Sequence, residues 1–303
     1  MGAIRTNMSV VLLMLCCCTQ VFVQTAIAQP NASAYYNYQD IYETQWSGDH
    51  IDVLNNGTEV QLVLDAQSGC GFQSQLNYTY GYFGISAKLV AGYSAGVVAA
   101  FFVSSSGPNH DEIDFEFLGN VSGQNVLQTN MFANGTGGRE QHMSLWFDPT
   151  ADFHTYEIIW NHAQIIWLVD QTPIRVFKNL ESIGQAYPTY QPAQVIGVIF
   201  DGSGWATHGP SGAIIGVNYT YAPFILSYEG FQLDACVNDG VDVPSCSSNY
   251  QNNWWEGSAY TNLTADQIST LEYITETYSS YNYCKDPSRY NPPPVECSYN
   301  YNS

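Results

Sequence analysis

An acidic strand in the first half of the chain constrains the fold more than any other feature. Residues 110–120 read His-Asp-Glu-Ile-Asp-Phe-Glu-Phe-Leu-Gly-Asn. Successive side chains of a β-strand point to opposite faces, so this segment places carboxylates on one face and large apolar side chains on the other. The acidic set is Glu112, Asp114 and Glu116, and the apolar set is Ile113, Phe115 and Phe117. Such a strand predicts a sheet that covers a core on one side only.

The acidic face fits the chemistry of a retaining glycosidase. The Cα atoms of Glu112 and Glu116 would lie about 13 Å apart at the usual strand rise. Side chains that lean together would bring their carboxylates to the ~5–5.5 Å separation of such enzymes, with the shorter Asp114 between them. One carboxylate then attacks and the other donates a proton, and sequence order does not say which. A solvated acidic edge or a calcium site built from carboxylates is the alternative.

Other motifs carry less weight, and neither a metal nor a cofactor is expected. Residues 92–96 match the G-x-S-x-G pattern, but a strand follows where a nucleophile elbow needs a helix. The glycine-rich residues 134–138 lack the lysine of a phosphate loop. No cysteine–histidine spacing resembles a zinc site. His110 shares the face of the acidic set, where a direct role and a hydrogen-bonded framework role are both open.

Strand-like runs separated by turns recur between residues 50 and 230 and predict an all-β fold. No helical periodicity separates them, which excludes a parallel sheet. The expected architecture is an antiparallel two-sheet β-sandwich of the jelly-roll, concanavalin-like kind, with one concave sheet. The runs are Val60–Leu64, Phe83–Val90, Val97–Val103, Ile113–Phe117, Tyr156–Trp160, Ile165–Val169, Ile174–Phe177 and Val195–Phe200.

Composition changes near Cys236, and one helix is expected beyond it. Thr264 and Gln267 form a capping-box pattern, which is followed by apolar residues at helical spacing and ends before Tyr281. Residues 29–230 are therefore expected to form the catalytic sandwich. Residues 231–303 are expected to form a disulfide-stapled extension packed on it, too small to fold alone.

The N-terminal residues predict export. Arg5, an apolar stretch over residues 8–23 and the small-x-small pattern that ends at Ala28 are typical of a secretory signal peptide over residues 1–28. The apolar stretch is too short for a membrane span, so the mature chain is expected to be soluble and secreted. Seven glycosylation sequons follow: Asn31, Asn56, Asn77, Asn120, Asn134, Asn218 and Asn262.

Five cysteines remain after the signal peptide, and most should pair in an exported protein. Local pairing is the simplest arrangement, with Cys236 bonded to Cys246 and Cys284 bonded to Cys297. Cys70 is then left over, and we interpret it as a buried free thiol.

The net charge of the chain restricts the kinds of molecule that it can bind. The chain has 7 basic and 27 acidic residues, a formal net charge of −20. Such a surface repels nucleic acid, anionic membranes and polyanionic polysaccharides. Neutral polysaccharides and oligosaccharides fit best, since the aromatic side chains offer faces for sugar rings, although strand packing should use most of them. We expect a monomer.

The acidic strand and several other segments resemble glycoside hydrolase family sixteen and, within it, the plant xyloglucan endotransglucosylase/hydrolases. The resemblance spans about residues 40–297. It implies retaining cleavage and religation of a β-1,4-glucan-backbone hemicellulose, most often xyloglucan, in the cell wall or apoplast. The similar segments are Leu64–Gln75, Lys88–Val103, Trp146–Trp160, Pro173–Lys178 and the plant-specific tail Tyr281–Cys297.

The same resemblance implies the roles of the acidic set. It makes Glu112 the nucleophile, Glu116 the acid/base and Asp114 the residue that orients and tunes Glu112. It also implies the two disulfides proposed above and a glycan on Asn120, just past the acidic strand. Packing beside like charges raises the pKa of an acid/base, as its role requires.

Contacts to sugar are expected from residues outside the acidic set. Gln128 and Asn130 share one strand face shortly after the motif, and the resemblance implies that they and Arg139 and Arg289 hold sugars. For each of these four, a structural hydrogen bond or surface ion pair is the alternative.

The segment Val198–Pro210 departs from the plant enzymes. It keeps Trp205, which we expect to contact sugar as part of an acceptor-side platform. This platform is altered, because Phe200 stands where they usually have tryptophan and His208 where they have arginine. The Lys-Thr-Asp-Trp that normally follows is absent. The acceptor and the balance between transfer and hydrolysis are therefore less defined than the catalytic strand. A hydrolase of xyloglucan or mixed-linkage β-glucan, and a catalytically dead lectin on the same sandwich, are the alternatives.

Overall fold

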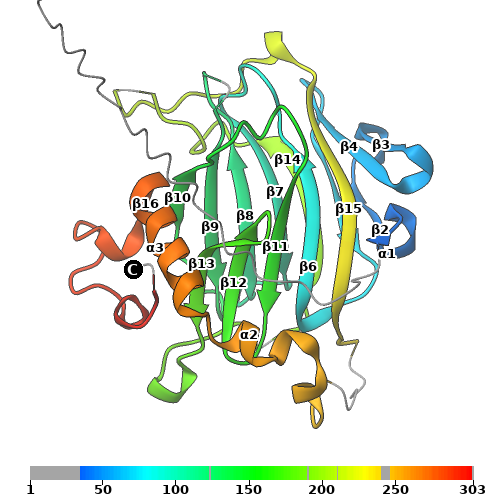
Figure 1. The fold of residues 1–303 in the computed structure, drawn as a ribbon. Coiled ribbons are helices and arrows are strands. Elements are labelled where there is room, and N and C mark those ends of the chain that lie inside the picture. Colours follow the sequence, from blue (N-terminus) through cyan, green and yellow to red (C-terminus); the bar gives the residue numbers. More distant parts are fainter. Residues whose placement is uncertain (1–34, 123, 190, 210, 240–245, 302–303) are drawn as a thin grey trace, which may run out of the picture.

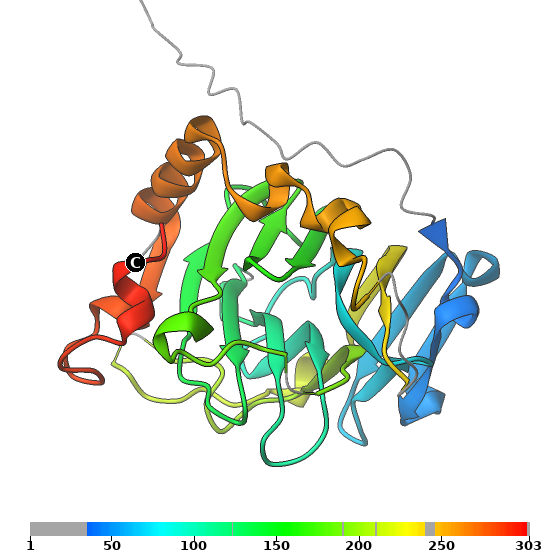
Figure 2. The same ribbon diagram turned by 90° about the horizontal axis from the view of Figure 1, so that it is seen from below.

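Two antiparallel sheets packed face to face form the body of the protein (Figure 1, Figure 2). The computed structural model describes residues 35–122, 124–189, 191–209, 211–239 and 246–301. The expected antiparallel sandwich of jelly-roll type is confirmed. The expected signal peptide and the sequon at Asn31 lie outside the described residues.

One sheet, here called the back sheet, contains the expected runs Tyr156–Trp160, Ile165–Val169 and Ile174–Phe177 as three consecutive antiparallel strands. Its strands in spatial order are β13 (Thr172–Lys178), β12 (Gln164–Val169), β11 (His154–Trp160), β6 (Tyr78–Lys88), β15 (Phe224–Val237), β4 (Glu59–Leu64) and β3 (Ile51–Leu54), and β1 (Tyr35–Tyr36) also pairs with β15.

The other sheet, here called the cleft sheet, contains the acidic strand as β8. Its strands in spatial order are β16 (Ser279–Asn282), β10 (Gln141–Ser144), β9 (Val126–Phe132), β8 (Glu112–Leu118), β7 (Val97–Ser104), β14 (Gln194–Asp201), β5 (Cys70–Ser74) and β2 (Tyr42–Trp46).

The side chains of β8 alternate between the core and the opposite face of the sheet, as expected. Ile113, Phe115 and Phe117 are fully buried in the core between the sheets. Burial of such side chains stabilises the fold by about 1.5–3 kcal/mol each. Because the side-chain period of a strand is two, this burial forces the acidic set onto the opposite face of the cleft sheet.

β15 is the longest strand, and it was missing from the expected set. Its alternation is broken at Gly230, which has φ +62° and lies where the register with β6 shifts. Such a bulge hides a strand from a period-two pattern. β15 also runs across residues 230 and 231, where we expected the chain to divide, and that division stays a prediction.

The C-terminal residues do more than pack on the sandwich. α3 (Ala265–Tyr278) begins with the expected capping box and contacts β13 of the back sheet and β10 of the cleft sheet (Figure 1). β16 follows directly and pairs with β10, so the extension adds an edge strand to the cleft sheet. Besides short 3-10 turns, the other helices in the described residues are the single α-helical turns α1 (Tyr38–Ile41) and α2 (Ser258–Thr261).

The cysteines are arranged as expected. The structure contains the disulfides Cys236–Cys246 and Cys284–Cys297. Cys70 is a buried free thiol whose Sγ donates to the carbonyl of His50, and burial raises its pKa to about 12. No helix in the described part of the chain is long and apolar enough to cross a membrane.

Candidate active site

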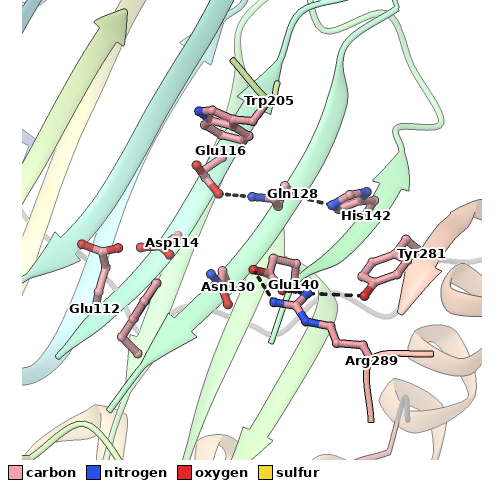
Figure 3. Close-up of a pocket in the computed structure, with 11 residues that line it drawn as sticks. Glu112, Asp114, Glu116, Gln128, Asn130, Glu140, His142, Trp205, Tyr281 and Arg289 are labelled. Carbon is pink, nitrogen blue, oxygen red and sulfur yellow. Dashed lines mark hydrogen bonds and ion pairs between the residues drawn. The ribbon is translucent and has the colours of Figure 1, made fainter. Parts of the chain in front are cut away.

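A cleft of about 440 Å³ lies on the outer face of the cleft sheet, and the whole acidic set faces it (Figure 3). The strands β8, β9, β10 and β16 build its floor. Of the sugar-contact residues expected from the sequence, the cleft contains Gln128, Asn130, Trp205 and Arg289. Four further lining residues were not expected: Phe132, Glu140, His142 and Tyr281.

Strand register places the side chains in rows across the cleft. Glu112 is paired with Phe132, Asp114 with Asn130, and Glu116 with Gln128. The register of β10 and β16 then extends the last row through His142 to Tyr281. These pairings are set between strands, which is why a search of single segments did not find His142 or Tyr281.

Glu116 lies in an environment that favours its protonated form. Burial raises its pKa to about 7, and the charges of Glu112 and Glu140 act in the same direction. Gln128 opposes this shift, because its Nε2 donates a hydrogen bond to Oε2 of Glu116 and so favours the charged form. The result is a carboxyl group that holds its proton up to near-neutral pH.

Asp114 lies at the centre of the acidic set and is almost fully buried. Burial raises its pKa well above the usual range, and the charges of Glu112 and Glu116 raise it further. The cation of Arg175 lowers it in part. The carbonyl of Asp114 accepts a hydrogen bond of 3.0 Å from Trp167 Nε1, which ties the middle of β8 to the back sheet.

Arg175 is a buried cation beneath the site that the sequence did not single out. It reaches across the core from β13, and its guanidinium donates to the carbonyls of Thr129 and Arg139 at 2.7 Å each. It also stacks on Trp167, 4.7 Å from the ring centre. Burial lowers its pKa to about 10, so it stays charged at neutral pH.

Arg139 does not line the cleft, contrary to the expected sugar contact. Its side chain is buried, and Nε donates to Oε1 of Glu296 at 2.8 Å while Nη1 donates to the carbonyl of Thr136. Glu296 is itself fully buried beside Cys297. Arg139 therefore has the structural role that we gave as its alternative, and it joins the β9–β10 loop to the C-terminal extension.

Arg289 does reach the cleft, and it is already paired there. Its Nη1 lies 2.6 Å from Oε2 of Glu140 and 3.4 Å from the hydroxyl of Tyr281 (Figure 3). The pair is partly exposed, so the guanidinium remains within reach of a ligand while its position is restrained. Tyr281 comes from β16, so the extension contributes directly to the cleft.

Trp205 forms part of the cleft wall above Glu116 (Figure 3). It is 41% exposed, which is unusual for tryptophan and leaves a ring face free for stacking. The neighbouring Thr207 hydroxyl donates to the carbonyl of Gly119 at 2.6 Å and accepts from the backbone N–H of Gly96 at 2.9 Å. These bonds hold the Trp205 loop against the end of β8.

His110 lies at the margin of the site. Its Nε2 is 4.0 Å from Glu112, its Nδ1 is 3.2 Å from the carbonyl of Gly107, and its ring packs against Phe132. It is thus placed as a framework group near Glu112, outside the residues that line the cleft.

The G-x-S-x-G match lacks the geometry of a nucleophile elbow. Ser94 of the G-x-S-x-G match is fully buried, and strand β7 follows it. Within the described ranges, no group of three or more histidine, cysteine, aspartate or glutamate residues is arranged to hold a metal ion.

The raised pKa of Glu116 has a consequence for stability. A glutamate in the unfolded chain has a pKa near 4.5, so between about pH 4.5 and 7 the folded protein holds the extra proton. The free energy of unfolding should therefore fall as pH rises through this window. We expect Glu116→Gln to remove the contribution of Glu116 to that fall and to gain about 3 kcal/mol on the wild type between pH 4.5 and 8.

Denaturant unfolding of both proteins across this pH range measures the effect. Two curves with the same pH dependence would mean that Glu116 has the same proton affinity in the folded and unfolded states.

A jelly-roll sandwich with three carboxyl groups in a row along an open cleft is the arrangement of a glycosidase that acts on polysaccharide. The model of glycosyl hydrolases family 16 matches residues 38–221, and that of the xyloglucan endo-transglycosylase C-terminus matches residues 249–297. The chain belongs to glycosyl hydrolases family 16 and, within it, to the xyloglucan endotransglucosylase/hydrolases.

Similar proteins agree with this membership. A probable xyloglucan endotransglucosylase/hydrolase protein 5 of Arabidopsis thaliana is 45% identical, over 84% of this chain and 86% of the relative. A xyloglucan endotransglucosylase protein of Populus tremula x Populus tremuloides is 44% identical, over 84% and 86%. The solved β-glucanase of Bacillus licheniformis shares the fold, with a TM-score of 0.53, 24% identity and coverage of 65% and 93%.

Proposed function

We propose that this chain is a secreted enzyme that cuts xyloglucan with retention of configuration and transfers the cut end to a sugar acceptor. The observation that carries the proposal is the acidic set of β8, which faces one cleft and includes a carboxyl group with a pKa of about 7. The assignment of xyloglucan as the substrate rests on the relatives, which are described as xyloglucan endotransglucosylase/hydrolases.

In the proposed reaction Glu112 attacks the anomeric carbon while Glu116 protonates the leaving oxygen. Glu116 suits the second role because it keeps a proton near neutral pH. Asp114 lies between them and is a buried carboxyl that holds its proton strongly, so it donates a hydrogen bond to Glu112 and orients it. Deprotonated Glu116 then activates the hydroxyl group that releases the glycosyl-enzyme.

Sugar contacts are proposed for the remaining cleft residues. Trp205 offers a ring face on the side of Glu116, where the leaving group and later the acceptor must lie. Arg289, Gln128 and Asn130 supply polar groups. His110 is proposed to act through its placement near Glu112.

The proposed setting is the plant cell wall or apoplast. Six sequons lie in the described residues, and none of their asparagines is buried, as glycosylation requires. A glycan on Asn120 and a signal peptide over residues 1–28 are part of the proposal. The net charge of −20 favours neutral polysaccharide and oligosaccharide acceptors over nucleic acid or anionic membranes, and we propose a monomer.

Incubation with polysaccharides and labelled acceptor oligosaccharides tests this function. With xyloglucan and a fluorescent xyloglucan oligosaccharide, we expect label to enter high-molecular-mass polymer. Shortening of the polymer without incorporation of label would indicate a hydrolase. Cleavage of mixed-linkage β-glucan alone would change the assigned substrate to that polysaccharide. Binding without any cleavage would support the lectin alternative.

The balance between transfer and hydrolysis tests the acceptor platform. Transfer wins when an acceptor stays bound long enough to exclude water, and Phe200 and His208 replace a tryptophan and an arginine that would strengthen that binding. We expect Phe200→Trp with His208→Arg to raise the transfer-to-hydrolysis ratio by about 5- to 150-fold, which corresponds to about 1–3 kcal/mol of acceptor binding.

The ratio is measured with xyloglucan as donor and increasing acceptor concentration. The single variants Phe200→Trp and His208→Arg are the matched controls, because each restores only one of the two side chains. An unchanged ratio in the double variant would place the acceptor platform elsewhere.

A further inference from the structure

A hydrogen-bonded row leads away from Glu116 to a histidine that nothing in the proposed reaction uses. Oε1 of Gln128 accepts a hydrogen bond of 2.6 Å from Nε2 of His142, while Nε2 of Gln128 donates to Glu116 (Figure 3). The ring of His142 packs against Tyr281, with ring centres 5.0 Å apart. Three strands thus contribute one side chain each to a continuous row.

The chemistry of a primary amide makes this row directional. An amide has a donating nitrogen end and an accepting oxygen end, and only the nitrogen end stabilises a carboxylate. An amide turned around would present its oxygen to Glu116 and favour the protonated carboxyl instead. Whatever fixes the orientation of Gln128 therefore decides how strongly Glu116 holds its proton.

We propose that His142 is a positioning residue that holds the Gln128 amide with its nitrogen toward Glu116 and so sets the pH range over which Glu116 works. This inference rests on the proposed acid/base role of Glu116. A ring Nε2–H can bind only the oxygen end of the amide, so the bond from His142 leaves the nitrogen end for Glu116.

The surroundings of His142 favour its neutral form, whose single ring proton is available for this bond. Burial lowers its pKa, and His208 acts in the same direction, whereas Glu140 raises it in part. Tyr281 covers the ring from β16. Gln128 is also buried, so bulk water has little access to its amide oxygen. Water therefore cannot easily replace His142 as the hydrogen-bond donor to this oxygen.

A matched pair of substitutions tests the proposal. His142→Phe keeps the ring against Tyr281 but removes the N–H, whereas His142→Gln restores an N–H at nearly the same place. We expect His142→Phe to move the alkaline limb of kcat/KM and the titration of Glu116 upward by about one pH unit, a tenfold change in proton affinity. We expect His142→Gln to return both to within about 0.3 pH units of the wild type.

The titration of Glu116 is followed without substrate, by its carboxyl band in difference infrared spectra assigned with Glu116→Gln. This measurement separates failure of the proposed function from failure of the positioning role of His142. Absence of activity on xyloglucan in the wild type would overturn the proposed function, while a shifted infrared midpoint in His142→Phe would still support the positioning role. An unshifted midpoint in His142→Phe, or equal shifts in both variants, would overturn the positioning role.

Discussion

Replacing Glu112 by alanine is expected to lower the rate of glycosyl transfer at least about a thousandfold, which corresponds to about 4 kcal/mol in the barrier. The reason is that the proposed glycosyl-enzyme forms on this carboxylate, and no other carboxyl group of the acidic set is placed to replace it. Asp114 is shorter, almost fully buried and strongly inclined to keep its proton. The fold should survive, because Glu112 is partly exposed on the cleft face.

The measurement is initial-rate kinetics with an aryl β-glycoside of a xyloglucan oligosaccharide, with and without azide. In Glu112→Ala, azide can take the place of the lost carboxylate and should give a glycosyl azide of inverted configuration. Glu116→Ala is the matched control, since azide should intercept its glycosyl-enzyme and give the retained configuration. Near-normal turnover of Glu112→Ala would end its assignment as nucleophile, and reversed azide products would exchange the two roles.

Replacing Glu296 by glutamine is expected to lower the free energy of unfolding by about 3–5 kcal/mol. Glu296 is fully buried and paired with the buried Arg139 at 2.8 Å, so the change leaves a cation in the interior without its counter-charge. The loss should fall on the junction between the β9–β10 loop and the C-terminal extension, which carries β16 and Tyr281. Activity should therefore weaken together with stability.

Equilibrium unfolding in denaturant, with both disulfides intact, measures this loss. Glu140→Gln is the matched control, because it breaks the partly exposed pair with Arg289, and such pairs contribute about 0–1 kcal/mol. Arg139→Met with Glu296→Leu should be less destabilised than Glu296→Gln alone, since no charge stays buried. Equal losses in Glu296→Gln and Glu140→Gln would show that burial of the first pair adds nothing.

Local patterns determined much of this protein. Alternation over residues 112–117 was enough to separate a core face from an acidic face, because the side-chain period of a strand is a local property. The capping box at Thr264 and Gln267 likewise placed the start of α3, since a helix cap depends on residues three apart. Disulfides between near neighbours followed from the export signal and short spacing.

Only the tertiary structure decided which residues outside β8 share the cleft. Arg139 and Arg289 are equally plausible in the sequence, yet the fold buries one against Glu296 and leaves the other beside Tyr281. His142 became visible only through the register of β9 with β10. Arg175 acts from the opposite sheet, and the bulge at Gly230 concealed β15. Pairing between strands, burial of charge and packing across the core join residues far apart in the chain, so no local pattern records them.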